Sequence, residues 1–232
     1  MTEPDLRPLA LITGASGGIG AAVARALAPG HDLLLGGRAA GVLQELAYEL
    51  PGSRPWPVDL TDMRAVAEAV AGISRLDVLV HSAGVGLLGT VAETSAATWR
   101  QQFDVNVVAV AELTRLMLPA LRAARGRVIL VNSGAGLIAN AGWASYAASK
   151  FALRAFADAL RAEEARHGVR VTSVHPGRTD TDMQRGVVRQ EGGTYQPRRY
   201  LRPESVAGAV LLAVTAPPDA ALTELVLRPA EG

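Results

Sequence analysis

Tyr146 and Lys150 are four residues apart in an Ala-rich stretch that is typical of a helix, so their side chains share one face. A tyrosine has a pKa near 10, and acid/base chemistry near neutrality needs a nearby cation that stabilises the phenolate. We expect Lys150 to supply that charge and to lower the pKa of Tyr146. The pair therefore predicts a proton-transfer site, although the same spacing also occurs on helices that do no chemistry.

A glycine-rich stretch joins an apolar run to another Ala-rich stretch near the start of the chain. Residues 13–20 read Thr-Gly-Ala-Ser-Gly-Gly-Ile-Gly. Glycines let the backbone turn sharply and approach a pyrophosphate, whose charge is stabilised by the free N–H groups at a helix start. Glycines also serve ordinary tight turns, but the position between a strand and a helix predicts a dinucleotide site.

The end of the second apolar run is where such folds read the adenosine ribose of the dinucleotide. An acidic side chain there binds the 2′-hydroxyl of NAD, whereas this chain reads Gly36-Gly37-Arg38. An arginine suits a 2′-phosphate, so we expect NADP(H) rather than NAD(H). The alternative is that Arg38 merely stands at an exposed helix start, where a cation is slightly unfavourable.

Positioning these residues requires a layered framework. Short runs rich in Val, Ile and Leu alternate with Ala-rich stretches of helical spacing, and continuous apolar runs are typical of strands buried on both faces of a parallel sheet. The pattern predicts an α/β fold: one Rossmann-like, doubly wound parallel sheet of about seven strands with helices on both faces, in a single domain over 1–232. The predicted strands are 8–13, 31–36, 54–58, 76–80, 127–131, 169–174 and 223–227, and the predicted helices are 18–28, 39–50, 62–71, 95–123, 145–166 and 203–214.

Helix ends and one interruption complete this outline. Asp62, Ser95 and Ser145 stand where a side-chain oxygen can cap a helix start, and Gly168 follows a helix end as a left-handed residue. The segment 183–202 is polar, contains glycine and lacks a clear period. We interpret it as a mobile lid over a pocket, with an ordinary surface loop as the alternative.

Composition and charge exclude several classes of function. The 232-residue chain has a net charge of +1, so no global field recruits nucleic acid or a membrane surface. It has no cysteine, and its four histidines lack paired ligand spacing, so we expect no disulfide, thiolate nucleophile or metal site. No apolar run is long enough to span a membrane, and the acidic N-terminus lacks the pattern of a signal peptide. We therefore expect a cytoplasmic enzyme with a small-molecule partner.

Taken together, these motifs resemble those of the short-chain dehydrogenase/reductase family over almost the whole length. In family order, the matching elements are the TGxxxGxG turn at 13–20, Asp59 after the third strand, Ala83-Gly84 after the fourth, Asn106 in a long helix, Ser133 after the fifth strand, YxxxK at 146–150 and Pro176-Gly177 after the sixth. Agreement of all seven by chance is negligible.

The resemblance implies a hydride transfer between a nicotinamide cofactor and a carbonyl/secondary alcohol pair. Tyr146 would act as general acid/base, and Ser133 would hydrogen-bond the same oxygen. Lys150 would hold the nicotinamide ribose, and Asn106 would position a water for proton relay. The cofactor-binding residues that it implies are Gly14, Ser16, Gly18, Ile19, Gly20, Arg38, Asp59, Leu60, Ala83, Gly84, Tyr146, Lys150, Pro176, Gly177, Thr179 and Thr181. Asp59 could instead cap the next helix, and Asn106 could instead bridge backbone.

One departure from the family pattern concerns the fourth strand. The family usually has Asn-Asn-Ala-Gly, whereas this chain has His81-Ser82-Ala83-Gly84 and so lacks a side-chain amide that steadies the central strands. We interpret His81 as structural rather than as a base. Family members usually pair through their long helices, so we expect a homodimer or homotetramer.

Two other functions compete with this interpretation. Residues 14–18 formally match the G-x-S-x-G of a serine hydrolase, with Ser16, His175 and Asp180 as a triad, but too little chain precedes Ser16 for that fold. A non-enzymatic NADP(H)-binding redox sensor would not need to keep the four catalytic side chains.

The substrate is not predicted by the sequence. Val85, Leu137 and Trp143 are candidate pocket residues, because they flank the catalytic positions. Segment 183–202 carries five arginines against one glutamate. That excess could attract an anionic substrate, although a solvated basic face is the more common reason for such a pattern.

Overall fold

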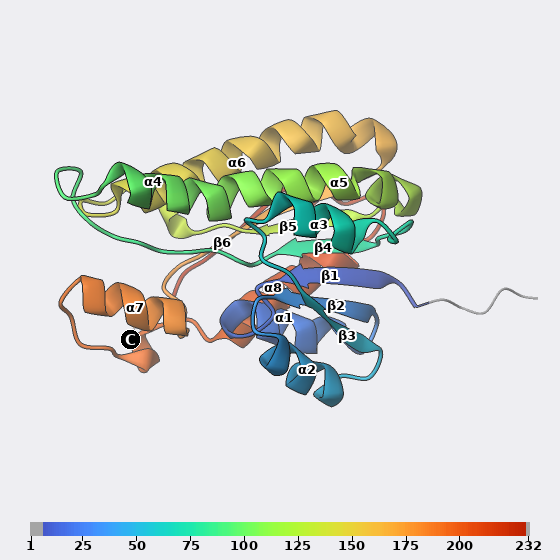
Figure 1. Ribbon diagram of the computed structural model, residues 1–232, viewed down its shortest axis with the longest axis horizontal. Coiled ribbons are helices and arrows are strands. Elements are labelled where there is room, and N and C mark those ends of the chain that lie inside the picture. Colours follow the sequence, from blue (N-terminus) through green and yellow to red (C-terminus); the bar gives the residue numbers. More distant parts are fainter. Residues whose placement is uncertain (1–6, 231–232) are drawn as a thin grey trace, which may run out of the picture.

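The computed structural model describes residues 7–230, in which seven strands form one parallel sheet of order β3-β2-β1-β4-β5-β6-β7. Figure 1 shows the sheet between two layers of helices. Each predicted strand is present within about two residues of its expected bounds. The strands are β1 (Leu9–Thr13), β2 (Asp32–Gly37), β3 (Ser53–Pro57), β4 (Val78–His81), β5 (Arg127–Val131), β6 (Arg170–Pro176) and β7 (Glu224–Leu227).

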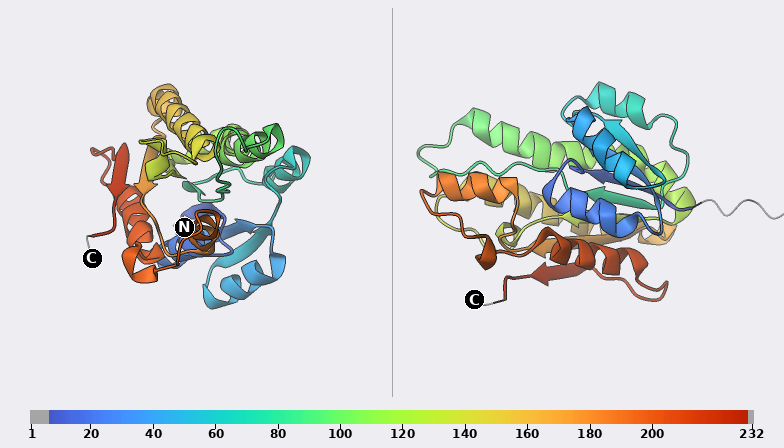
Figure 2. Two further views of the ribbon diagram at one scale, coloured as in Figure 1. Left: turned by 90° about the vertical axis from the view of Figure 1, so that its left-hand side faces the viewer. Right: turned by 90° about the horizontal axis from the view of Figure 1, so that it is seen from below.

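Helices cover both faces of the sheet, and successive side chains of each strand point to opposite faces. In β1, Ile12 belongs to a cluster of side chains with α1 (Gly18–Leu27), α2 (Ala40–Glu49) and α8 (Pro203–Thr215). Leu11 belongs to the opposite cluster, with α3 (Met63–Val70), α5 (Ala109–Ala124) and α6 (Ala144–Glu164). The two views of Figure 2 show these helix layers on either side of the strands. Both clusters are built mainly from Ala, Val and Leu, which permits close helix-on-sheet packing.

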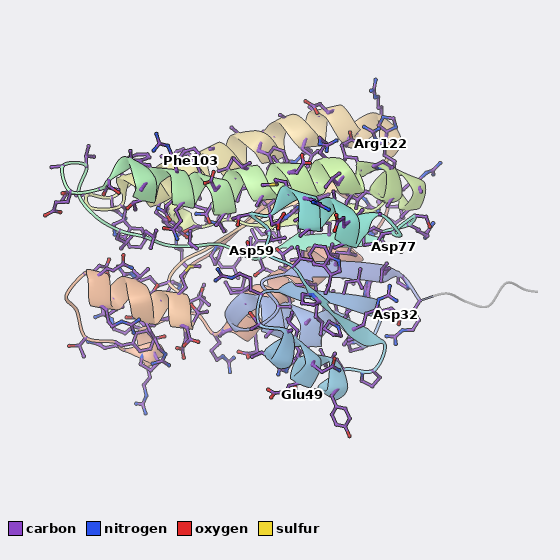
Figure 3. The ribbon with its side chains drawn as sticks, viewed as in Figure 1. Asp32, Glu49, Asp59, Asp77, Phe103 and Arg122 are labelled. Carbon is purple, nitrogen blue, oxygen red and sulfur yellow. The ribbon has the colours of Figure 1, made fainter. Side chains whose placement is uncertain are left out.

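The predicted helix 95–123 is a continuous helical run that contains an irregular turn. It begins with α4 (Ala96–Phe103), passes through a single π-helical turn at Asp104–Val108, labelled η1, and continues as α5. The predicted helix 145–166 is α6 followed by a short 3₁₀ turn, η3 (Ala165–His167). Figure 3 shows Arg122 near the far end of α5, where its guanidinium pairs with Glu164 of α6 at 2.6 Å.

Most of the predicted helix ends are confirmed. Asp62 accepts hydrogen bonds from Arg64 N and Ala65 N at the start of α3, and Ser95 accepts one from Thr98 N at the start of α4. Gly168 has φ of 75°. The prediction for Ser145 is wrong: α6 begins at Ala144 without a side-chain cap, and the buried Ser145 hydroxyl instead donates to the carbonyl of Leu87.

Segment 183–202 is not the irregular loop that its polarity suggests. Its first part belongs to α7 (Asp182–Gln190), and a 3₁₀ turn, η4 (Pro197–Arg199), follows. Thr181 caps α7 through a hydrogen bond from Gln184 N, and Val187 and Val188 bury one face. The interspersed arginines and Gly186 hide this period in the sequence. Within residues 7–230, no helix is long and apolar enough to cross a membrane.

Candidate active site

The predicted site residues follow the carboxyl ends of six neighbouring strands. Because all strands are parallel, these ends lie along one edge of the sheet, and the strand order reverses between β1 and β4, where ligands of such sheets bind. In Figure 1 this edge faces α7. The residues that come within two positions of a strand end are Gly14 after β1, Arg38 after β2, Asp59 after β3, Ala83 after β4, Ser133 after β5 and Gly177 after β6.

The glycine-rich turn after β1 has a shape that side chains would block. Gly14 has φ of 69°, and a Cβ there would lie 2.8 Å from the backbone nitrogen of Ala83. Gly18 has φ of 52°. Ser16, Gly17 and Gly18 are exposed, and the N-terminus of α1 has neither a capping side chain nor an acidic residue in its first turn. Free N–H groups at an open helix start fit a pyrophosphate, so the turn fits the dinucleotide predicted from the sequence.

Ser16 and Arg38 both lie at the end of β2. The hydroxyl of Ser16 would lie 3.5 Å from a Cβ built on Gly37, and Arg38 is exposed one residue further on. Arg38 precedes α2, which begins at Ala40 and has no side-chain cap. The two side chains thus offer a hydroxyl and a guanidinium at one corner.

Asp59 borders this corner after β3, where Figure 3 labels it. It does not cap α3, since Asp62 does so; instead its Oδ1 accepts from the backbone and hydroxyl of Thr61 at 2.9 and 2.7 Å. These hydrogen bonds, together with the nearby charge of Arg38, hold the pKa of Asp59 below its usual value. Leu60 packs on the core beside it.

A cavity of about 350 Å³ lies next to the glycine-rich turn and contains Ser133, Tyr146 and Lys150. Val85 and Trp143 line it, as expected for pocket residues, whereas Leu137 does not and its neighbour Ile138 does. Asn106 is not part of the wall. Six of the predicted cofactor residues also line the cavity: Ile19, Gly84, Pro176, Gly177, Thr179 and Thr181.

Tyr146 is 8% exposed, and the edge of its ring packs against Trp143 at a centroid distance of 5.8 Å. Burial raises the pKa of Tyr146, and a hydrogen bond with the Ser133 side chain partly offsets that rise. We expected a lowered pKa from Lys150, and this expectation is wrong for the protein alone. Desolvation disfavours a phenolate, a cost that spacing in the sequence does not reveal.

Ser133 is held in place by the short turn that follows it. It begins the 3₁₀ turn η2 (Gly134–Gly136), and its oxygen accepts a hydrogen bond from Ala135 N at 3.1 Å. Its hydroxyl hydrogen faces the Tyr146 oxygen in the protein alone, and the same hydrogen can be donated to a ligand oxygen that lies beside Tyr146. The serine can therefore donate to a carbonyl oxygen next to Tyr146.

Lys150 lies one helical turn after Tyr146 and is only 5% exposed. Its ammonium donates to the carbonyl of Val131 at 3.2 Å and lies 5.9 Å from the centre of the Tyr146 ring. Burial lowers the pKa of Lys150 to about 8. Asn132, which the sequence reasoning missed, donates to the carbonyl of Lys150 at 3.1 Å and so ties α6 to the end of β5. Its position directly before Ser133 was the available signal.

Asn106 bridges backbone from within the π-helical turn. Its side chain accepts from Val85 N at 2.9 Å and donates to Val85 O at 3.0 Å, and it also donates to Ser149 Oγ at 3.0 Å. A Cβ on Gly84 would lie 3.2 Å from its oxygen and 3.9 Å from Lys150 Nζ. Asn106 thus fixes the segment after β4 at the floor of the site, while its role in a water relay stays a prediction.

His81 replaces the usual amide at the end of β4 with a neutral imidazole. Its Nε2 lies 2.9 Å from Thr114 Oγ1, whose own hydrogen is donated to Val110 O at 2.7 Å, so Nε2 carries the hydrogen. Complete burial lowers the pKa of His81 to about 3. The side chain therefore fixes β4 to α5, and its imidazole stays neutral near neutrality, so it is not a general acid.

This burial predicts a specific pH dependence of stability. An unfolded histidine has a pKa near 6.5, so between pH 6.5 and about 3 the unfolded chain binds a proton that folded His81 does not. The free energy of unfolding then falls on acidification by up to about 1.4 kcal/mol per pH unit from this one group. His81→Asn should flatten the slope between pH 6 and 4 by about that amount in urea unfolding measured across pH. Equal slopes for the two proteins would contradict this assignment.

The segment after β6 links the cavity to α7. A Cβ on Gly18 would lie 3.0 Å from the methyl group of Thr181, so the start of α7 rests on the glycine-rich turn. Arg178 binds Glu191, just after α7, at 2.7 and 2.6 Å, and its guanidinium stacks on Trp143 at 5.6 Å. These contacts hold α7 and its following loop against the cavity.

The hydrolase triad is not assembled. The imidazole Nδ1 of His175 lies 3.1 Å from the carbonyl of Ser133, and its Nε2 faces Glu224 at 3.7 Å. Asp180 is engaged elsewhere, as acceptor of a hydrogen bond from the Tyr195 hydroxyl and ion partner of Arg185. The arginines of 183–202 are mostly exposed, as expected for a solvated basic face.

Comparison with known proteins gives one consistent result. The family described as short chain dehydrogenase matches residues 8–192. The curated dehydrogenase/reductase SDR family member 11 of Bos taurus is 33% identical over 245 aligned residues, covering 96% of both proteins.

Solved structures agree in fold as well as in length. An alcohol dehydrogenase from the archaeon Thermococcus sibiricus, complexed with 5-hydroxy-NADP, is 29% identical with a TM-score of 0.86 over 96% of each chain. A serine dehydrogenase from Escherichia coli is also 29% identical, with a TM-score of 0.82 over 94% of this chain and 96% of its own.

Proposed function

Since the chain belongs to the short-chain dehydrogenase/reductase family of NAD(P)(H)-dependent oxidoreductases, we propose that it transfers a hydride between NADP(H) and a carbonyl/secondary alcohol pair, with Tyr146 as general acid/base. The observation that carries the proposal is the cavity that brings Ser133, Tyr146 and Lys150 together beside a glycine-rich turn fitted to a pyrophosphate. A redox sensor would need the turn but not the three polar side chains.

The roles of the residues follow from their contacts. When bound, the cofactor supplies or accepts the hydride at its nicotinamide ring. In reduction, the Tyr146 hydroxyl gives its proton to the carbonyl oxygen while the hydride reaches the carbon, and Ser133 donates a hydrogen bond to the same oxygen. Because burial keeps the pKa of Tyr146 above its ordinary value, the protonated form that carbonyl reduction requires predominates near neutrality.

Lys150 completes the proton path. Its pKa of about 8 leaves the ammonium largely protonated at neutral pH, next to the phenolate that the reaction creates. In the same proposal Lys150 holds the nicotinamide ribose. Pro176, Gly177, Thr179 and Thr181 hold the nicotinamide, and Asp59 and Leu60 the adenine. The two relatives described as an alcohol dehydrogenase and a serine dehydrogenase support the reaction class.

A preference for NADP(H) over NAD(H) rests on the corner after β2. Arg38 and Ser16 offer a guanidinium and a hydroxyl there, and a neighbouring carboxylate, Asp59, accepts hydrogen bonds from Thr61. A 2′-phosphate would receive charge-assisted hydrogen bonds from Arg38, whose positive charge also offsets the negative charge of Asp59. The relative complexed with 5-hydroxy-NADP supports the same preference.

Arg38→Ala tests this preference through binding alone. We expect the Kd for NADPH to rise about 10- to 100-fold, the loss of one charge-assisted phosphate contact, and the Kd for NADH to stay within about twofold. The measurement is a fluorescence titration of each nucleotide. Arg54→Ala removes an exposed arginine from β3 and serves as the matched control. An equal loss for both nucleotides would assign Arg38 to the shared part of the cofactor instead.

Turnover tests the reaction itself. Absorbance of NADPH should fall with some members of a panel of aldehydes, ketones and oxo acids, and rise when the matching alcohols meet NADP⁺. Binding of NADPH without turnover of any compound would favour the sensor alternative, and no binding would overturn the proposal.

Assembly and location stay predictions from the sequence. Exposed apolar side chains such as Val108 and Phe151 on the η1 turn and α6 support pairing of copies through these helices into a homodimer or homotetramer. The cytoplasmic location is an expectation from the sequence alone.

A further inference from the structure

Arg228 comes directly after β7 and lines the cavity that contains Ser133 and Tyr146. Its Nη1 donates to the carbonyl oxygens of His175 at 3.2 Å and Leu227 at 3.0 Å. A Cβ built on Gly134 would lie 3.3 Å from Nη1 and 3.4 Å from Nη2. The guanidinium is therefore held by backbone contacts, packed against the residue that follows Ser133.

The charge of Arg228 is not balanced inside the described part of the chain. Among the cavity-lining residues of the region 7–230, Lys150, Arg178 and Arg228 are cationic and none is Asp or Glu. Arg178 has its partner in Glu191. Arg228 forms no ion pair with a carboxylate of the described residues, and Glu224 of the same strand is bound by Arg154 at 2.9 Å.

The unused donors of Arg228 suit one kind of ligand. Within residues 7–230, only Nη1 of the guanidinium has acceptors, which leaves the other N–H groups free of protein partners. A planar guanidinium binds a carboxylate through two parallel hydrogen bonds. Lys150 is also unpaired, but the proposed function assigns its charge to the cofactor and to Tyr146, so the guanidinium of Arg228 is the cation left for a negative charge on the substrate. The cavity of about 350 Å³ is near the lower end for ligand sites, which favours a small ligand.

We propose that Arg228 binds the carboxylate of the substrate, so that the enzyme acts on short oxo-carboxylic acids and the corresponding hydroxy acids. The carbonyl oxygen lies at Ser133 and Tyr146, and the carboxylate lies across η2 at Arg228. This inference rests on the proposed function for its chemistry, but the anion site itself can be measured without turnover.

The kinetic test uses short oxo-carboxylates that have one to four carbons between the carbonyl and the carboxylate. Each acid is compared with its methyl ester. The wild type should prefer the acid to its ester by about tenfold or more in kcat/KM. Arg228→Gln should raise the KM for the acid about 10- to 30-fold, leave kcat within about twofold and remove the preference. Arg228→Lys keeps the charge but loses the paired N–H groups of the guanidinium, so its KM for the acid should lie between those of the wild type and Arg228→Gln. Arg166→Gln, the same change at the opposite end of the sheet, should behave as wild type.

The binding test uses calorimetry with NADP⁺-loaded protein and unreactive carboxylates of the same lengths. Wild type and Arg166→Gln should bind them, and Arg228→Gln should bind about tenfold or more weakly. This result without turnover of any compound would support the anion site while the proposed function fails. An acid preference that survives Arg228→Gln, or carboxylate binding that is unchanged in that variant, would overturn the inference. A higher Kd of Arg228→Gln for NADPH would also overturn the inference, because it would show that Arg228 binds the cofactor.

Discussion

Tyr146→Phe is expected to lower kcat for carbonyl reduction by a factor of about 10² to 10⁴, the range that general acid catalysis contributes. The variant keeps the buried ring and its contact with Trp143, so the protein should remain folded. Its Kd for NADPH should change by less than about threefold. The hydroxyl is the only group removed, and no other described residue of the cavity has a phenol to replace it. Steady-state kinetics together with a nucleotide titration measure both quantities.

Tyr48→Phe provides the matched control, because this tyrosine is 92% exposed on α2, away from the cavity. It should retain wild-type kcat and KM. If Tyr146→Phe turned over at more than a tenth of the wild-type rate, the proton would have another source, and the assignment of Tyr146 as acid would have to be withdrawn.

Gly20→Ala is expected to damage both stability and cofactor binding. A Cβ at position 20 would collide with the carbonyl oxygen of Gly14 and lie 2.6 Å from its carbon. Both partners are backbone, so the turn between β1 and α1 must move. We expect a loss of about 2–4 kcal/mol in the free energy of unfolding and a rise of more than about 100-fold in the Kd for NADPH.

The matched control for this change is Gly208→Ala in α8, another helical glycine. Position 208 is exposed and has no atom within 4 Å of a built Cβ. Alanine is favoured over glycine in helices by about 0.5–1 kcal/mol, so this variant should be slightly more stable and bind NADPH normally. Urea unfolding and fluorescence titration give both values. An unchanged Gly20→Ala protein would show that the turn is not rigid.

The fold could be predicted because its signal is local. Most strands contain a short continuous apolar run, since both sheet faces are covered, and the helices lie between such runs. The positions after the strands follow from the parallel direction alone. For this reason the sequence also located Gly14, Arg38, Ser133 and Gly177 on one edge.

The errors arose where remote contacts decide the structure. The period of α7 is interrupted by Arg185, which pairs with both Asp180 and Asp182. Its cap, Thr181, is held against Gly18 at the start of α1. Burial reversed the expected direction of the pKa of Tyr146. Arg228 follows the predicted strand 223–227, so the same signal applied to it, but the sequence does not reveal that β7 pairs with β6, which brings this arginine to the cavity.

The π-helical turn at Asp104–Val108 determines how α4 is rotated about the helix axis relative to α5. In this turn Ala109 N bonds to the carbonyl of Asp104, five residues back, so the turn spends one residue more than an α-helix would. Deleting any one residue of the turn would restore ordinary winding, and each residue of an α-helix turns by about 100°. Either α4 would rotate away from α6, or α5 would rotate away from α3 and β4. The five-residue length of this turn is thus fixed, because the loss of even one residue would misplace one of the two helices that it joins.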